Sequence, residues 1–260
     1  MRPVKDGAES NRPGIDLTFG APKSVSILGL MGGDTRLVDA FRESVTETLT
    51  QLEKSVNTRV TENGEVSLKE TNSALMALFT HDINRNGEMH LHTHALLLNA
   101  THDGEKWRAL GSDIHNRNGI REQVYDLQVA WGQMQREILR PKIEALGYTT
   151  VNTGKNGLFE IAEVPREVVA LYSTRAAEIN QFVEPGASAR SRQLAALKTR
   201  EQKTFVDGET RQSEWWKTLE GHDFDPKQVV ATARENGKTE KTTTTALRNI
   251  EREIIKSFED

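Results

Sequence analysis

The sequence has no cysteine among its 260 residues, which excludes disulfide bonds and thiolate metal sites. It has no apolar run near the roughly 18 residues that a membrane span requires. The first 14 residues, MRPVKDGAESNRPG, lack the apolar core of a signal peptide. We therefore expect a cytoplasmic protein that does not insert into a membrane.

The chain also lacks a strong excess of either charge, because 34 Lys and Arg oppose 38 Asp and Glu for a net charge of −4. That total does not indicate a nucleic-acid binder. The cations are unevenly spread, however, and five of them fall between residues 190 and 203. Such a local cluster can bind phosphate, although a solvated helix face is the alternative interpretation.

Hydrophobic spacing predicts strands and helices in separate segments. Residues 14–19 have the pattern of a short strand, and turn signals predict three or four antiparallel strands over about 66–110. Those signals are Asn63-Gly64, Asn84-Arg85-Asn86-Gly87 and Asp103-Gly104. Apolar residues recur every three or four positions in 38–56 and 124–138, which predicts helices there, and we expect Pro141 to kink or split the second one.

From residue 164 onward the pattern is helical. The expected helices cover 164–183, 187–201, 210–219, 226–236 and 241–258. We therefore expect an α+β fold, with a central antiparallel sheet flanked by helices and a helical C-terminal region.

Three histidines stand at alternate positions in an apolar, strand-like stretch that continues to Ala100. Side chains alternate faces along a strand, so His90, His92 and His94 point the same way, about 7 Å apart. His81 ends a second strand-like run, and antiparallel pairing of the two strands would bring it to the same place. Three protein ligands with an open position are typical of a catalytic metal. We expect these ligands to be His81, His92 and His94, whereas His90 could equally be solvated.

The ligand set constrains the chemistry. Imidazoles suit zinc, nickel, copper or iron, and magnesium or manganese fit if phosphate oxygens and water fill the open positions. A ligand histidine usually donates its second ring N–H to a carboxylate. Asp16 is the candidate, because a carboxylate between apolar strand residues needs a reason to be buried. A surface aspartate at a strand edge is the alternative.

Two stretches resemble the relaxase domain of MobF-type conjugative relaxases, the TraI/TrwC group of the HUH endonuclease superfamily. The first, GIDLTFGAPKSVS at residues 14–26, is similar to the family's Asp-Leu-Thr-Phe-Ser-Ala-Pro-Lys-Ser-Val-Ser motif. The second runs from His81 through Leu91-His92-Thr93-His94 to Asn99 and resembles the family's three-histidine metal motif. The resemblance extends over about residues 14–185.

The resemblance implies a metal site at His81, His92 and His94, holding magnesium or manganese, with zinc or nickel as alternatives. It implies that Asp16 orients a ligand histidine and helps to activate the nucleophile. The implied activity is nicking and rejoining of one DNA strand at a plasmid origin of transfer in bacteria, by a tyrosine that stays bound to the 5′ end. Relaxosome accessory proteins and a type IV secretion coupling protein are the implied partners. The implied domains are an HUH core at 1–185 and a helical region at 186–260 that closes over single-stranded DNA.

The chain departs from the family in its tyrosines. Relatives carry catalytic tyrosines several dozen residues before the motif that contains Asp16, whereas here fifteen residues precede Asp16 and none is tyrosine. The chain is then either N-terminally shortened or without the usual nucleophile and first strand, and we expect metal and DNA binding with cleavage reduced or absent. Tyr125, 31 residues after His94, is the alternative nucleophile, as in rolling-circle replication initiators. A core position on an amphipathic helix is its simpler interpretation.

Single-stranded DNA binding requires cations for phosphates and aromatic faces for bases. We expect Lys23, Lys106 and Arg108 to flank the metal site. The expected contribution of the C-terminal region is Arg190, Arg192, Lys198 and Arg200, with Trp215 and Trp216 either stacking on bases or packing in the core. A module that only binds DNA and metal is a competing function. An unrelated three-histidine hydrolase or oxygenase is another, against which the motif around Asp16 argues.

Overall fold

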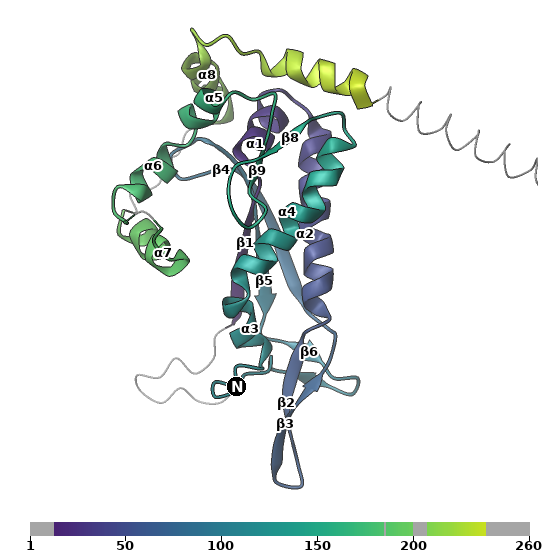
Figure 1. Ribbon diagram of the computed structural model, residues 1–260. Coiled ribbons are helices and arrows are strands. Elements are labelled where there is room, and N and C mark those ends of the chain that lie inside the picture. The colour runs from purple at the N-terminus through teal and green to yellow at the C-terminus, as the bar shows by residue number, and fades with distance from the viewer. Residues whose placement is uncertain (1–12, 185, 200–206, 238–260) are drawn as a thin grey trace, which may run out of the picture.

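The structure is a computed structural model that describes residues 13–184, 186–199 and 207–237. At its centre is an antiparallel sheet in the order β1-β5-β4 (Figure 1). The histidine strand β5 (Met89–Leu98) lies between β1 (Gly14–Gly20) and β4 (Met76–Ile83). This confirms the predicted α+β fold with a central antiparallel sheet.

The remaining strands form separate hairpins rather than one continuous meander. These hairpins are β2 (Asn57–Glu62) with β3 (Glu65–Glu70), β6 (Thr101–His102) with β7 (Trp107–Arg108), and β8 (Thr150–Asn152) with β9 (Phe159–Ile161). After β3, the Thr71 N–H donates to the carbonyl of Val56, which lies just before β2 (2.9 Å). The strand β3 pairs with β2 and not with β4.

Helices cover one face of the sheet. They are α1 (Lys23–Leu30), α2 (Thr35–Glu53), α3 (Ile120–Asp126) and α4 (Gln128–Glu144), with α2 and α4 side by side in Figure 1. The core lies between this layer and the sheet: Leu91 and Ala95 of β5 pack with Phe41 of α2 and Leu139 of α4. The side chains on the buried face of β5 thus pack in the core.

Pro141 does not split the helix. The helix α4 passes through it and ends at Glu144, because proline removes one N–H donor while its carbonyl still accepts from the Ala145 N–H (2.9 Å). The break comes earlier instead, at Leu127, which separates α3 from α4.

The C-terminal helices are α5 (Arg166–Leu171), α6 (Thr174–Asn180), α7 (Ala189–Lys198), α8 (Gly208–Leu219) and a helix over 226–237. The expected helix over 164–183 is therefore two, separated at Tyr172 and Ser173, where the buried Tyr172 donates its hydroxyl to the Trp215 carbonyl (2.7 Å). The predicted helix over 241–258 lies outside the described residues.

Parts of the region 186–260 share the core of the sheet domain. Trp215 and Leu219 of α8, with Val230 and Ala233 of the helix over 226–237, belong to the same buried cluster as β5. By contrast, α6 and α7 form an arm on the side of the sheet away from α2 and α4 (Figure 1). The boundary at residue 185 thus does not separate two independent cores.

The helix over 226–237 touches the turn after α4 backbone to backbone. Gly147 has φ +95°, and a Cβ there would lie 2.0 Å from the Ala233 carbonyl oxygen, so only glycine fits this position. Within the described residues, no helix combines the length and the apolar character needed to cross a membrane.

Candidate metal centre on the open face of the sheet

The histidines occupy the face of β5 that the helices leave uncovered. Along the strand, buried residues alternate with partly exposed ones, and the three histidines fall on the partly exposed side. The register sets His81 of β4 directly opposite His92, and Thr18 of β1 opposite His94. The predicted antiparallel pairing that brings His81 to the histidine strand is therefore present.

The rings of His81, His92 and His94 form a nearly equilateral triangle. Their centroids are 5.4, 5.5 and 5.3 Å apart. A point equidistant from the three centroids lies about 3.1 Å from each. This is close to the roughly 3.2 Å between a ring centroid and a metal held at about 2.1 Å by a ring nitrogen. The spacing of this donor set therefore fits one metal ion.

Two of the three rings have a second partner that sets their orientation. The Nδ1 of His94 lies 2.9 and 3.0 Å from the two carboxylate oxygens of Asp16, and 3.2 Å from Thr18 Oγ1. The Nδ1 of His92 lies 2.7 Å from the backbone carbonyl of His90. An Nδ1–H that donates to such acceptors makes Nε2 the ring nitrogen that would ligate a metal.

The side chains do not yet form a complete metal site. Among the described residues, no group of three or more His, Asp or Glu side chains is placed to hold a metal ion. The ring spacing fits one ion, so binding would require a rearrangement of these side chains.

Asp16 differs from expectation in its burial. Its side chain is 53% exposed, because Asp16 lies on the open face of the edge strand β1, while its neighbours Ile15 and Phe19 point into the core. The carboxylate contacts His94 all the same. Burial was thus the wrong reason for singling out Asp16, although the contact with a histidine is as expected.

His90 is stacked rather than solvated. Its ring lies 4.8 Å from that of His92 at 22°, and Gly20 of β1 leaves room for it, since a Cβ there would come within 3.2 Å of the ring. Burial, followed by the charges of Lys23 and His92, lowers the pKa of His90 to about 3. The ring therefore stays neutral at physiological pH.

Ser24 and Ser26 at the start of α1 have partners that the sequence pattern did not predict. Both are fully buried. The Ser24 hydroxyl and N–H donate to the Glu160 carboxylate of β9, and its oxygen accepts from the Ile161 N–H (2.8 Å). The Ser26 hydroxyl oxygen accepts from the Leu91 N–H of β5 (3.0 Å). Serine at alternate positions just after a helix start was a usable signal, because buried hydroxyls need partners.

The predicted DNA-contacting cations of the sheet domain do not gather at the histidines. The ammonium of Lys23 is near them but donates to the Met89 carbonyl (2.6 Å). Lys106 and Arg108 belong to the β6–β7 hairpin beyond the other end of β5, and Leu98 alone is about 13 Å along the strand from His94. They do not flank the site, because the chain continues away from the histidines after β5.

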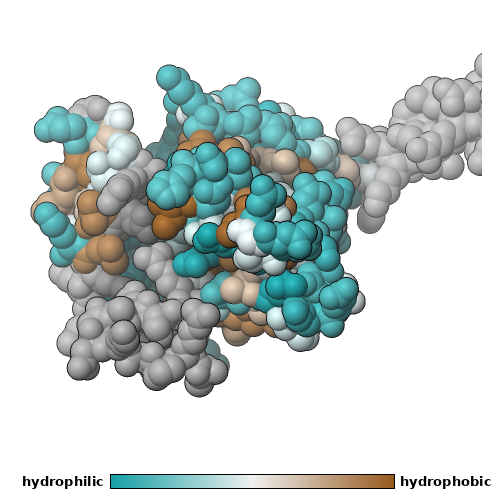
Figure 2. Space-filling model, turned by 90° about the horizontal axis from the view of Figure 1, so that it is seen from below, coloured by the Kyte–Doolittle hydropathy of each residue, from teal (hydrophilic) through white to brown (hydrophobic). Residues whose placement is uncertain are grey.

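Arg108 forms an ion pair with Asp103, which is buried, and lines a cavity of about 720 Å³ with Arg59 and His115. Viewed from this end, the surface is mostly hydrophilic, with hydrophobic residues in separate patches (Figure 2). Lys106 is exposed there. Lys106 and Arg108 therefore lie in a part of the surface that is separate from the histidine face.

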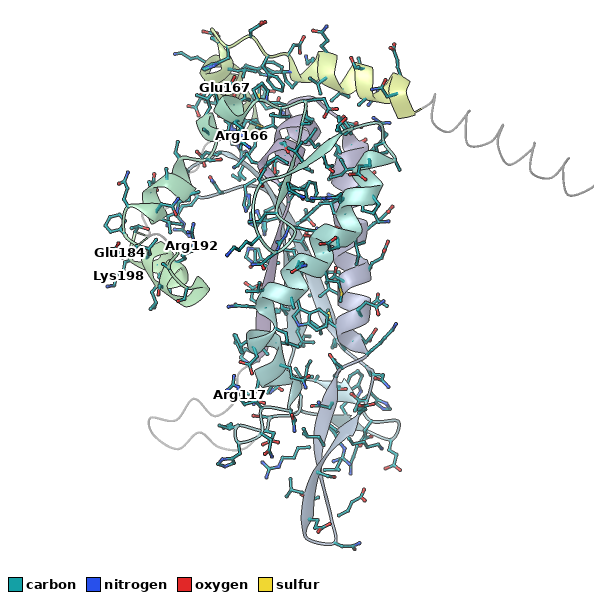
Figure 3. The ribbon with its side chains drawn as sticks, in the orientation of Figure 1. Arg117, Arg166, Glu167, Glu184, Arg192 and Lys198 are labelled. Atoms are coloured by element: carbon teal, nitrogen blue, oxygen red, sulfur yellow. The ribbon has the colours of Figure 1, made fainter. Side chains whose placement is uncertain are left out.

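The arm carries the C-terminal cations. Arg192 and Lys198 are exposed on α7, and Figure 3 shows both side chains on the arm. Arg190 falls within α7, and Arg200 lies outside the described residues. The described part of the region 186–260 thus includes a cationic helix beside the sheet.

None of the three tyrosines lies at the histidine triangle. Tyr148 and Tyr172 are buried, and Tyr148 donates to Asp34 (2.7 Å). Tyr125 is exposed on α3, a helix that packs through Ile120 and Val124 against the buried face of the sheet. The structure therefore does not bring Tyr125 to the histidine triangle.

The two tryptophans have different environments. Trp215 is buried and donates its indole N–H to the Gly87 carbonyl (2.8 Å), which is the core position considered above. Trp216 is 37% exposed, with the Lys227 ammonium 5.2 Å from its ring centroid.

Comparison with known proteins gives a consistent result. A family model described as TrwC relaxase matches residues 2–222. The multifunctional conjugation protein TraI of Escherichia coli (strain K12) is 43% identical over 222 residues, which cover 85% of this chain and 12% of that protein. This chain therefore spans only a small part of the length of its curated relative.

Solved structures of the conjugative relaxase TrwC are also similar. One is a metal-free complex with oriT DNA, and another is a metal-bound complex with oriT DNA. Each has a TM-score of 0.75 and 28% identity over 87% of this chain, and the match covers 80% and 78% of the respective TrwC chains.

Proposed function

This chain belongs to the TrwC relaxase family, and we propose that it is the metal-binding and DNA-binding core of a conjugative relaxase. Its substrate in this proposal is single-stranded DNA at a plasmid origin of transfer. The reaction of the complete enzyme is site-specific and strand-specific nicking and rejoining by transesterification. The related TraI and TrwC proteins, by their names, act in conjugation, and TrwC is seen with oriT DNA.

The observation that supports this proposal best is the histidine triangle with a carboxylate beside it. In this proposal His81, His92 and His94 hold a divalent ion, magnesium or manganese, with zinc or nickel as alternatives. Asp16 fixes the tautomer of His94 by accepting its Nδ1–H. The bound ion would polarise an oxygen of the scissile phosphodiester and stabilise the charge that develops there.

The exposed cations Arg192, Lys198 and Lys106 are the proposed phosphate contacts, with Arg190 and Arg200 as further candidates. Arg108 has a lesser part, because its charge is opposed by Asp103. Contacts of this kind make DNA affinity fall steeply with salt. A cover over the DNA is also a proposal for the region 186–260. The position of its helix α7 beside the sheet supports this proposal, whereas α8 and the helix over 226–237 pack in the core.

Cleavage by this chain alone is proposed to be impaired. Transesterification requires a hydroxyl aligned with the phosphate, and the three tyrosines lie elsewhere. A binding-only role for this chain is the second candidate, and the same observation favours it. In the cell, we propose the bacterial cytoplasm as its location, with relaxosome accessory proteins and a type IV secretion coupling protein as partners.

The test uses a fluorescent single-stranded origin-of-transfer oligonucleotide with and without Mn²⁺. We expect binding by fluorescence anisotropy, Mn²⁺ binding by isothermal titration, and no covalent adduct on a denaturing gel. An H94A variant should lose Mn²⁺ binding and is the control. A 5′ adduct formed by this chain would contradict the impaired-cleavage proposal, and its loss in Y125F would identify Tyr125 as the nucleophile. Absence of Mn²⁺ binding would contradict the metal site.

A further inference from the structure

The strand β5 extends past the end of its neighbour β1 at the histidine end of the sheet. The ladder between β1 and β5 ends where Gly20 faces His92. Beyond this point the chain turns at Pro22 into α1, so β1 no longer supplies partners to Met89, His90 and Leu91. The backbone groups of this stretch on the β1 side therefore need other partners.

The first turn of α1 and Ala21, two residues before it, supply these partners. The Ala21 N–H donates to the Leu91 carbonyl (2.9 Å). The Ser26 hydroxyl oxygen accepts from the Leu91 N–H (3.0 Å), and the Lys23 ammonium donates to the Met89 carbonyl (2.6 Å). Two side chains and one backbone group thus take over the role of a neighbouring strand.

The backbone at residues 89–91, held in this way, determines where His92 lies. Leu91 lies between His90 and His92, and the His90 carbonyl accepts from Nδ1 of His92. Displacement of this backbone would move both the Cα of His92 and the acceptor that orients its ring. The position of one ligand of the triangle therefore depends on the α1 contacts.

The charge of Lys23 is already balanced within the protein. The ammonium is partly buried, and the carboxylates of Glu88 and Glu160 are close enough to interact with it. Burial lowers the pKa of Lys23 in spite of these two carboxylates. A lysine that contacts DNA phosphate is usually exposed, as Lys106 is here.

We propose that Lys23 and Ser26 are positioning residues, which hold the β5 backbone beneath the metal histidines, and that Lys23 makes no contact with DNA phosphate. The link to metal rests on the proposed function. The hold on the backbone does not, and it can be tested separately.

The first experiment compares K23M with wild type, with K106M as the matched control. Loss of a nearby positive charge should by itself tighten binding of a divalent cation, whereas loss of positioning should weaken it. We expect Mn²⁺ affinity by isothermal titration to fall about tenfold in K23M, as for other groups that orient ligands indirectly. The Cu²⁺ electron paramagnetic resonance spectrum should also change, because it reports the geometry of bound imidazoles. Neither should change in K106M.

The second readout is the salt dependence of single-stranded DNA binding. Each phosphate contact contributes about 0.7 to the slope of log affinity against log salt concentration for single strands. We expect no change of slope in K23M. A slope reduced by about 0.7, or an unchanged Mn²⁺ affinity, would overturn the proposal.

The third readout needs no metal. Hydrogen exchange of the peptide that covers residues 89–93 should be faster in K23M and in S26A than in wild type, while exchange in β2 and β3 stays the same. Unchanged exchange in both variants would overturn the proposed hold on β5. If wild type binds no Mn²⁺, the proposed function fails, and the exchange result still decides for or against the role of the two residues.

Discussion

The two faces of β5 have different roles, because one packs in the core and the other carries the histidines of the candidate site. On one face, Met89, Leu91 and Ala95 are buried against helices, whereas on the other His90, His92 and His94 are only partly covered. The polar groups near the two faces differ as well. The Asp34 side chain is fully buried among Arg36 and Tyr148, but Asp16 is half exposed beside His94.

The contrast between the two faces determines which effects a substitution can have. Groups on the helix side contribute to the free energy of unfolding. Their apolar side chains are buried, and their polar groups form hydrogen bonds that water does not reach. Groups on the histidine side are partly solvated and contribute little to folding, so their spacing is free to serve ligand binding. The following predictions test this separation.

The largest expected effect is on the buried face. L91A should lower the free energy of unfolding by about 3 kcal/mol, because it removes buried methyl groups and leaves a cavity. Urea denaturation provides the measurement. The matched control is L96A on the partly exposed face, for which we expect a loss below about 1 kcal/mol. Equal losses in the two variants would contradict the separation.

H94A should weaken metal binding strongly and change stability little. We expect Mn²⁺ affinity to fall at least a hundredfold, about 2.7 kcal/mol, with the free energy of unfolding changed by less than about 0.5 kcal/mol. Isothermal titration and urea denaturation give the two values. H102A, on β6 and outside the triangle, should leave Mn²⁺ affinity unchanged, and a loss in that variant would place the metal elsewhere.

Y148F tests the buried carboxylate and its pH dependence. We expect a loss of about 2 kcal/mol at pH 7, because a hydrogen bond to a buried charge is removed. Burial raises the pKa of Asp34, but hydrogen bonds from Arg36 and Tyr148 and the charge of Arg36 outweigh it and lower the pKa below 3.8. Stability from the ionised carboxylate is therefore present above pH 3.8 and is lost as the pH falls through the lower native pKa.

The gap in unfolding free energy between wild type and Y148F should accordingly narrow below about pH 3.8. Urea denaturation at pH 7 and pH 3 gives the comparison. Mn²⁺ affinity at pH 7 should be the same in both proteins. A gap that is equal at both pH values would show that the hydroxyl does not act through the Asp34 carboxylate.

D16N should have the smallest effect, and only on the metal. The amide accepts a hydrogen bond less strongly than the carboxylate, so we expect Mn²⁺ affinity to fall about tenfold, or 1.4 kcal/mol. Stability should be unchanged, because the Asp16 side chain is half exposed. The matched control is D39N, an exposed aspartate on α2, and a similar loss of affinity in D39N would point to a general charge effect.

The sequence predicted the local features of the site well. The alternation of side chains between the two faces of β5 and the turn at Asn84–Gly87 are properties of short segments. Together they predicted that His81 lies opposite His92, as the structure shows. The contact of His94 with Asp16 was also expected, although the exposure of Asp16 was not.

The direction of the chain beyond each element was harder to predict. Nothing in the residues after β5 shows that Lys106 and Arg108 move away from the histidines, because that depends on the packing of the β6–β7 hairpin at the other end. The contacts of Ser26 and Lys23 with β5 likewise join residues about 65 positions apart. Such contacts follow from the end of β1 at Gly20, which only the three-dimensional arrangement shows.

The contact between Gly147 and the backbone at Ala233 bears on how fragments of this protein should be cut. The family match ends at residue 222, which makes that position an attractive place for a stop codon. A fragment that ends there lacks Val230 and Ala233, which are buried in the core, and would expose apolar surface beside the start of α2. Such a fragment should therefore aggregate. Fragments meant for crystallisation, or for carrying an affinity tag, should therefore retain the helix over 226–237.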